Sequence, residues 1–85
     1  MKIVYSPRFV KLYNKLNNSI KLKAEKKEEI FRKNPFDSRL ETHKLSGWLD
    51  GLWSFSVDYD CRIIFELKNE KMVIFHAIGG HSIYK

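Results

Sequence analysis

Four side chains in this 85-residue sequence stand out as able to do chemistry: three histidines and one arginine. The arginine, Arg62, lies in the segment from Cys61 to Leu67, which is otherwise almost wholly apolar. A guanidinium keeps its charge and is rarely buried alone, so Arg62 either pairs with an acid or faces an anion in a cleft. Arginine can hold a phosphate through two hydrogen bonds, and histidine can move a proton near neutral pH. These residue types suit a phosphodiester substrate.

The three histidines have different sequence settings. His76 lies inside an apolar stretch, where we expect a structural histidine with a hydrogen-bond partner. His81 follows two glycines at the end of that stretch, where a side chain can project into solvent or into a cleft. His43 precedes Lys44 in a basic loop. His81 and His43 are therefore better candidates for a site than His76.

Aromatic residues near these positions can stack on unpaired bases. Tyr84 is the first of them, and Trp48 and Phe36 are further candidates. Packing inside a core is the alternative interpretation for Tyr84 and Trp48, and it is the preferred one for Trp53.

The sequence gives no sign of a metal or cofactor site. The histidine spacing matches no zinc signature, and a single cysteine, Cys61, can form no internal disulfide framework. We expect Cys61 to be a small buried side chain. There is no glycine-rich phosphate loop, nucleophile-elbow serine or kinase motif. We therefore expect no metal and no cofactor.

The elements that must position these residues follow from residue patterns. A short apolar segment predicts a first strand, and Ser6-Pro7 is typical of a helix start. Two helices then precede a connecting segment at 38–46, after which glycines mark turns and three strands follow. Strands joined by tight turns must be antiparallel neighbours. The expected ranges are strand 2–5, helices 7–16 and 20–33, and strands 53–58, 61–67 and 71–78.

Charge is distributed unevenly along the chain. The formal net charge is +6, and residues 1–33 hold ten Lys or Arg against three Glu, a local balance of +7. This excess indicates either a surface that faces a polyanion or a solvated helix face. Hydrophobic residues make up 44% of the chain, which favours a folded globule over disorder. No apolar run reaches transmembrane length, so we expect a cytoplasmic protein without membrane contact.

Two segments together are similar to a known family. The stretch HKLSGWLDGLWSFSVDYDCRIIFEL and the later VIFHAIGGHSIY resemble the RelE/ParE superfamily of toxins, especially the RelE-like branch that includes YafQ and YoeB. The resemblance covers nearly the whole chain and implies one α+β domain over residues 1–85. Its order would be β-α-α-β-β-β, with an N-terminal helical hairpin packed on one face of a small, mainly antiparallel sheet.

The resemblance also implies an activity and a set of site residues. It implies a type II toxin that cleaves mRNA in the ribosomal A site without metal, by attack of a ribose 2′-OH on the adjacent phosphate. His81 would be a general acid or base, Arg62 would neutralise the phosphate, and His43 would be a further catalytic residue. Lys44, Tyr84 and Arg39 would bind RNA. The implied partners are a cognate antitoxin, mRNA on the ribosome and ribosomal RNA.

Two alternatives remain within the same resemblance. One is a ParE-like toxin that inhibits gyrase, and the other is an inactive homologue that only binds its antitoxin. The proton acceptor also stays open, because residues 54–60 contain no histidine. Glu41 lies only near the place of the glutamate used in the YoeB-like branch.

Overall fold

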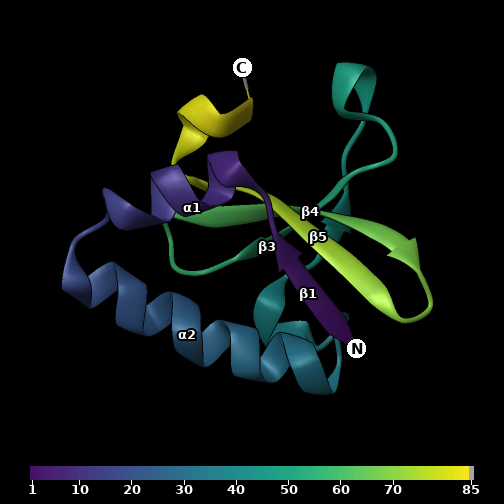
Figure 1. The fold of residues 1–85 in the computed structure, drawn as a ribbon, viewed down its shortest axis with the longest axis horizontal. Helices are drawn as coiled ribbons and strands as arrows, with labels where there is room; N and C mark the ends of the chain where they lie inside the picture. The colour runs from purple at the N-terminus through teal and green to yellow at the C-terminus, as the bar shows by residue number, and fades with distance from the viewer. Residues whose placement is uncertain (85) are drawn as a thin grey trace.

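Two helices pack on a five-stranded sheet in the computed structural model, which describes residues 1–84 (Figure 1). The predicted α+β class and the predicted helical hairpin are therefore confirmed. The helices are α1 (Pro7–Asn14) and α2 (Asn18–Lys33). The strands are β1 (Lys2–Tyr5), β2 (His43–Lys44), β3 (Trp53–Ser56), β4 (Arg62–Asn69) and β5 (Met72–Gly79). Three short 3-10 helices complete the list: η1 (Ser38–Leu40), η2 (Gly47–Leu49) and η3 (His81–Tyr84).

The sheet has the strand order β1-β5-β4-β3-β2. Strands β2 to β5 are antiparallel neighbours, whereas β1 runs parallel to β5 at the sheet edge. The parallel pair requires a long crossover connection between β1 and β5. The other three strand pairs are antiparallel, so the sheet is mainly antiparallel, as predicted.

Local sequence explains where both helices begin. The Ser6 side chain caps α1 by accepting a hydrogen bond from the backbone N–H of Phe9, and Pro7 occupies the first turn. Asn17 caps α2 in the same way, through the backbone N–H of Ile20. Because of this asparagine cap, α2 begins at Asn18, two residues before the predicted start.

The main core lies between the helices and one face of the sheet. Phe31 of α2 is fully buried, and its ring centroid lies 4.9 Å from that of Phe55, 4.9 Å from that of Phe65 and 5.3 Å from that of Phe75. Edge-on and stacked aromatic contacts of this kind add to the hydrophobic gain from burial. This cluster fixes the sheet against α2.

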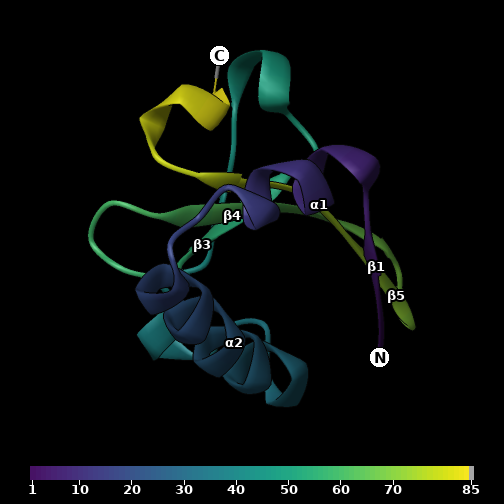
Figure 2. The same ribbon diagram turned by 60° about the vertical axis from the view of Figure 1, so that its left-hand side comes forward.

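The second face of the sheet is also covered. Ile64, Ala77 and Ile83 form a separate buried cluster, with Leu45 and Leu52 packed against it. In Figure 2, α2 lies on one side of the strands, while η2 and η3 rise on the other. Both the loop after β2 and the C-terminal segment therefore flank this second face.

The segment at 38–46, predicted as a plain connection, contains η1 and the fifth strand β2. A two-residue strand gives almost no periodic signal, which explains why the sequence did not predict it. Strand β3 ends at Ser56 rather than at residue 58, because residues 57–60 form the bend to β4.

The predictions for Cys61 and His76 are confirmed. Cys61 is buried, as predicted. His76 has its predicted partner, because its Nε2 lies 2.9 Å from Oε1 of Glu66. Within residues 1–84, no helix is both long enough and apolar enough to cross a membrane.

Candidate functional site

Arg62 begins β4 on the second face of the sheet, opposite Ser56 of β3 and Gly79 of β5. Within residues 1–84, no ion pair includes Arg62, so pairing with an acid is the wrong alternative. Its Nη1 atom is buried and has no hydrogen-bond partner among these residues. A buried donor without a partner is unfavourable. Arg62 as a whole is only half-buried and lines two cavities, so other atoms of this charged side chain are available to an anion.

His81 and Arg62, nineteen positions apart in the sequence, line the same cavity. We call it the His81 cavity, and its volume is about 190 Å³. Tyr84 also lines it, and the ring centroids of His81 and Tyr84 are 5.9 Å apart. The six lining residues are Tyr59, Asp60, Arg62, Gly80, His81 and Tyr84.

The position of His81 depends on the short helix η3. Its backbone follows Gly79, which has φ of 153°, and Ile83 anchors the segment because its side chain is buried under the second face. A Cβ atom on Gly79 would lie 2.9 Å from Cγ2 of Ile83, so only glycine fits there without displacement. His81 itself is exposed and can reach a substrate.

A second cavity, of about 610 Å³, is also lined by Arg62, and we call it the Glu41 cavity. Glu41 has φ of 51°, an uncommon backbone conformation for a residue other than glycine. Asp58 on the same wall lies 3.6 Å from Nζ of Lys23, so its charge is partly offset. The lining residues are Lys27, Glu41, Ser56, Asp58, Tyr59 and Arg62.

His43 lies on β2 and lines neither of these cavities. Its partner in the sheet register is Ser54, and its Nε2 lies 3.4 Å from the Ser54 hydroxyl. Its Nδ1 lies 3.2 Å from the backbone oxygen of Glu41. Cross-strand neighbours share a face, so His43 lies on the same sheet face as Ser54 and borders the Glu41 segment.

Lys44 and Arg39 also lie outside the two cavities. The Nζ atom of Lys44 is 5.9 Å from the centroid of the Trp53 ring, a cation–π arrangement. Arg39 forms a two-pronged pair with Asp37, through distances of 3.0 Å and 2.9 Å. The Arg39 side chain and backbone N–H lower the pKa of Asp37 to about 2. Arg39 is therefore already engaged with a carboxylate at neutral pH.

The cavities are also lined by residues that the sequence did not single out. Tyr59 lines both cavities, Asp60 lines the His81 cavity, and Lys27, Ser56 and Asp58 line the Glu41 cavity. Tyr59 and Asp60 lie in the bend between β3 and β4, where residue types do not show what a side chain faces. Among residues 1–84, no group of three His, Cys, Asp or Glu side chains is arranged to hold a metal ion.

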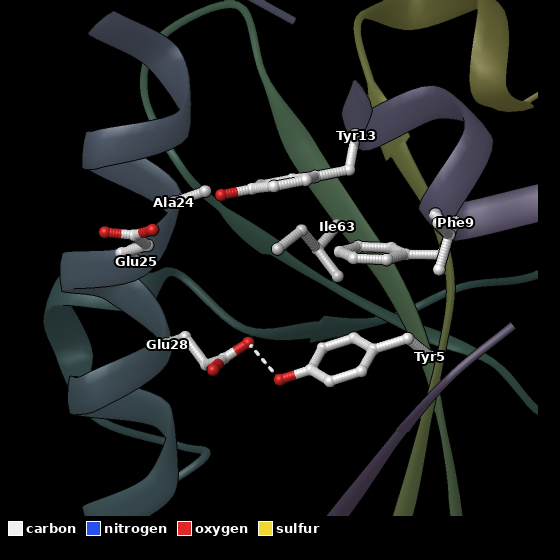
Figure 3. Close-up of a pocket in the computed structure, with 8 residues that line it drawn as sticks. Tyr5, Phe9, Tyr13, Ala24, Glu25, Glu28 and Ile63 are labelled. Atoms are coloured by element: carbon white, nitrogen blue, oxygen red, sulfur yellow. Dashed lines mark hydrogen bonds between the residues drawn. The ribbon is translucent and has the colours of Figure 1, made fainter. Parts of the chain in front are cut away.

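A third cavity, of about 300 Å³, lies between the two helices and β1, on the opposite face from Arg62 (Figure 3). Its walls include the rings of Tyr5, Phe9 and Tyr13. The Tyr5 hydroxyl donates a hydrogen bond of 2.9 Å to Glu28, and burial together with this carboxylate raises the pKa of Tyr5. This cavity contains none of the predicted site residues.

Neither a protein-family model nor a curated protein sequence matches the chain. Solved structures do. YafQ from E. coli strain BL21(DE3) has a TM-score of 0.81 and 22% identity, over 98% of this chain and 96% of YafQ. The YoeB/ParE toxin from Agrobacterium tumefaciens also scores 0.81, at 16% identity over 95% and 99% of the two chains. YafQ in the E. coli DinJ-YafQ toxin-antitoxin complex scores 0.69, at 24% identity over 96% and 93%. The chain therefore has the fold of the YafQ and YoeB toxins, the RelE-like fold.

Proposed function

We propose that this protein is the toxin of a type II toxin–antitoxin system and that it cleaves mRNA on the ribosome. The observation that carries the proposal is the His81 cavity, which is lined by both the half-buried Arg62, which has no ion pair among residues 1–84, and the exposed His81. An arginine aimed at a phosphate and a histidine able to transfer a proton are the two groups that phosphodiester cleavage needs. The shared fold with YafQ and YoeB supports the same conclusion.

In the proposed reaction the ribose 2′-oxygen forms a bond to the adjacent phosphorus while the bond to the 5′-oxygen breaks. The 2′-OH gives its proton to a base, and the leaving 5′-oxygen takes one from protonated His81. Arg62 stabilises the negative charge that builds on the phosphoryl oxygens. The products are a 2′,3′-cyclic phosphate and a 5′-hydroxyl end.

Glu41 is the better placed of the two candidate bases. An in-line displacement puts the attacking and leaving oxygens on opposite sides of the phosphorus, so the base and the acid must also lie on different sides. Arg62 lines both cavities, with Glu41 in one and His81 in the other. His43 lines neither, and its contact with the backbone oxygen of Glu41 fits a role in positioning that segment.

The proposed protein partner is a cognate antitoxin, as in the E. coli DinJ-YafQ toxin-antitoxin complex. The excess of positive charge over residues 1–33 favours an acidic contact segment in that partner. We expect the antitoxin to block or displace the segment 79–85, whose last residue lies outside the described residues 1–84. A structure of the complex that leaves both this segment and Arg62 open would contradict that expectation.

Mapping of mRNA ends tests the proposal. Purified protein is added to ribosomes programmed with a defined mRNA, and 5′ ends are mapped by primer extension. We expect A-site cuts from the wild type and at least about 100-fold slower cutting by His81→Ala and by Arg62→Ala. His76→Ala is the matched control, because His76 is bound to Glu66 and lies outside both cavities.

Two outcomes would reject the nuclease. If transcripts stay intact while DNA breaks accumulate in cells, the protein acts on gyrase. If the protein binds an antitoxin but neither RNA nor DNA is damaged, it is an inactive homologue.

A further inference from the structure

Among the exposed large hydrophobic residues of the described chain, residues 1–84, Tyr59 has the highest exposed fraction, and it lines both cavities of the proposed site. It is 95% exposed, although it stands in the bend between two well-packed strands. A tyrosine ring carries a large apolar surface that gains free energy when it is covered. Nothing within residues 1–84 covers this ring to a significant extent, so it is available to another molecule.

The backbone beneath Tyr59 is firmly held. The N–H of Val57 donates to the backbone oxygen of Cys61 at 2.8 Å, and the N–H of Asp60 donates to Oδ1 of Asp58 at 2.9 Å. Val57 and Cys61, on the two sides of the bend, are both buried. The ring therefore projects from a turn of defined shape, which reduces the entropy lost when a ligand binds to it.

Tyr59 also occupies a special position relative to Arg62. These two residues are the only ones that line both the His81 cavity and the Glu41 cavity, as far as residues 1–84 show. A phosphate held by Arg62 would thus lie next to the tyrosine ring on either side. In a single-stranded nucleic acid, the group next to a phosphate is a nucleoside whose base can turn outward.

We infer that Tyr59 stacks on an unpaired base of the RNA strand beside the phosphate bound by Arg62, and thereby positions the strand between the two cavities. This inference rests on the proposed function. Tyr84 lies in the His81 cavity, so the strand would meet one aromatic ring at the bend and another at η3. The cation and the imidazole of that cavity favour a nucleic-acid base over an apolar protein side chain as the ligand.

Steady-state cleavage of ribosome-bound mRNA tests the inference with four variants. We expect Tyr59→Ala to raise KM on the order of 10-fold with little change in kcat, because stacking on one base is lost. Tyr59→Phe should behave like the wild type, since it keeps the ring. Leu67→Ala is the control, because Leu67 is also an exposed large hydrophobic residue but lines neither cavity. His81→Ala shows the effect on cleavage of losing the proposed general acid.

A binding measurement separates stacking from a merely structural effect. The His81→Ala protein is added to ribosomes whose A-site codon contains 2-aminopurine, a base whose fluorescence is quenched by stacking. We expect the His81→Ala protein to quench this fluorescence, and we expect the double variant with His81→Ala and Tyr59→Ala not to quench it. Thermal unfolding should be unchanged, because the side chain is exposed.

The outcomes distinguish this inference from the proposed function. If Tyr59→Ala cleaves and quenches like the wild type while His81→Ala fails to cleave, the inference is wrong and the nuclease stands. If the loss in Tyr59→Ala is confined to antitoxin binding, Tyr59 belongs to a protein interface and the inference is also wrong. If the wild type does not cleave mRNA, both the inference on Tyr59 and the proposed function are wrong.

Discussion

At the scale of single residues, Arg62 shows a conflict between stability and function. Its Nη1 atom is buried without a hydrogen-bond partner among residues 1–84, and its neighbours in the strand are apolar. A buried nitrogen without a hydrogen bond lowers the stability of the folded state, although Arg62 as a whole is only half-buried. A residue kept under this penalty is a good candidate for binding a ligand that supplies the missing contacts.

Arg62→Met tests this interpretation, because methionine keeps the apolar stem and removes the charge. We expect the midpoint of thermal unfolding to stay equal or to rise, while the rate of mRNA cleavage falls by about 100-fold or more. Differential scanning fluorimetry and primer extension measure the two quantities. A variant that is clearly less stable than the wild type would show that the guanidinium contributes to folding instead.

The thiol of Cys61 gives a second prediction at this scale. Burial, together with the nearby charge of Asp58, raises its pKa from the ordinary value of 9.0 to about 11. At pH 8 we expect the native thiol to react with a disulfide reagent at least about 100-fold more slowly than the unfolded thiol, because far less of it is thiolate.

The same shift affects stability at high pH. The folded state holds the thiol proton more tightly, so this contribution to stability is complete below pH 9 and is lost as the pH rises toward 11. The difference between wild type and Cys61→Ala in urea unfolding at pH 8 and pH 10.5 measures it. Equal pH dependence in both proteins would contradict the prediction.

At the scale of elements, the decisive piece is the short helix η3, which carries His81 and Tyr84 to the face that holds Arg62. A helix of four residues is too short to be stable by itself, and the N–H of Ile83 donates a hydrogen bond of 3.2 Å to the backbone oxygen of Gly80. Its position therefore depends on the buried Ile83 side chain and on the close approach allowed by Gly79.

Gly79→Ala should displace η3 without unfolding the sheet, since the new methyl group would meet Ile83 at 2.9 Å. We expect cleavage to fall by about 100-fold, because a shift of roughly 1 Å at a catalytic group has an effect of that size. Gly80→Ala is the control, since its added Cβ would lie 3.4 Å from the nearest atom, the backbone oxygen of Asp60. Equal losses in both variants would argue against the steric explanation.

The elements also show how far sequence reasoning reaches. The helix start at Ser6-Pro7 made the first helix predictable, whereas the two residues of β2 left no periodic signal. Arg62 and His81 line one cavity, which agrees with the predicted order of the strands. Their catalytic roles remain predictions. Tyr59 was missed because the direction of a side chain at a bend depends on backbone geometry that residue types do not specify.

At the scale of the whole molecule, positive charge is concentrated in the N-terminal part. Residues 1–33 carry a balance of +7, and the rest of the chain carries −1. Lys26 and Lys33 of α2 are exposed and take part in no ion pair among residues 1–84. Such side chains are available to contact the phosphates of ribosomal RNA.

Replacing both Lys26 and Lys33 with Gln should weaken binding to ribosomes and reduce the slope of log K against log salt by roughly one to two. The control is Lys68→Gln with Lys71→Gln, which removes the same charge at the β4–β5 turn. Sedimentation with ribosomes at several salt concentrations measures the affinities. An equal effect of both double variants would mean that net charge matters and the helix surface does not.

The parallel pairing of β1 with β5 has a consequence for biosynthesis. Ile3 faces Val73 across that pair, so the earliest strand to leave the ribosome has no neighbour until the latest strand has emerged. Contacts so distant along the chain slow folding. Under the proposed function, a growing polypeptide of this sequence would therefore not yet act on the ribosome that makes it, because the arginine and the imidazole meet only after translation has passed both β5 and η3.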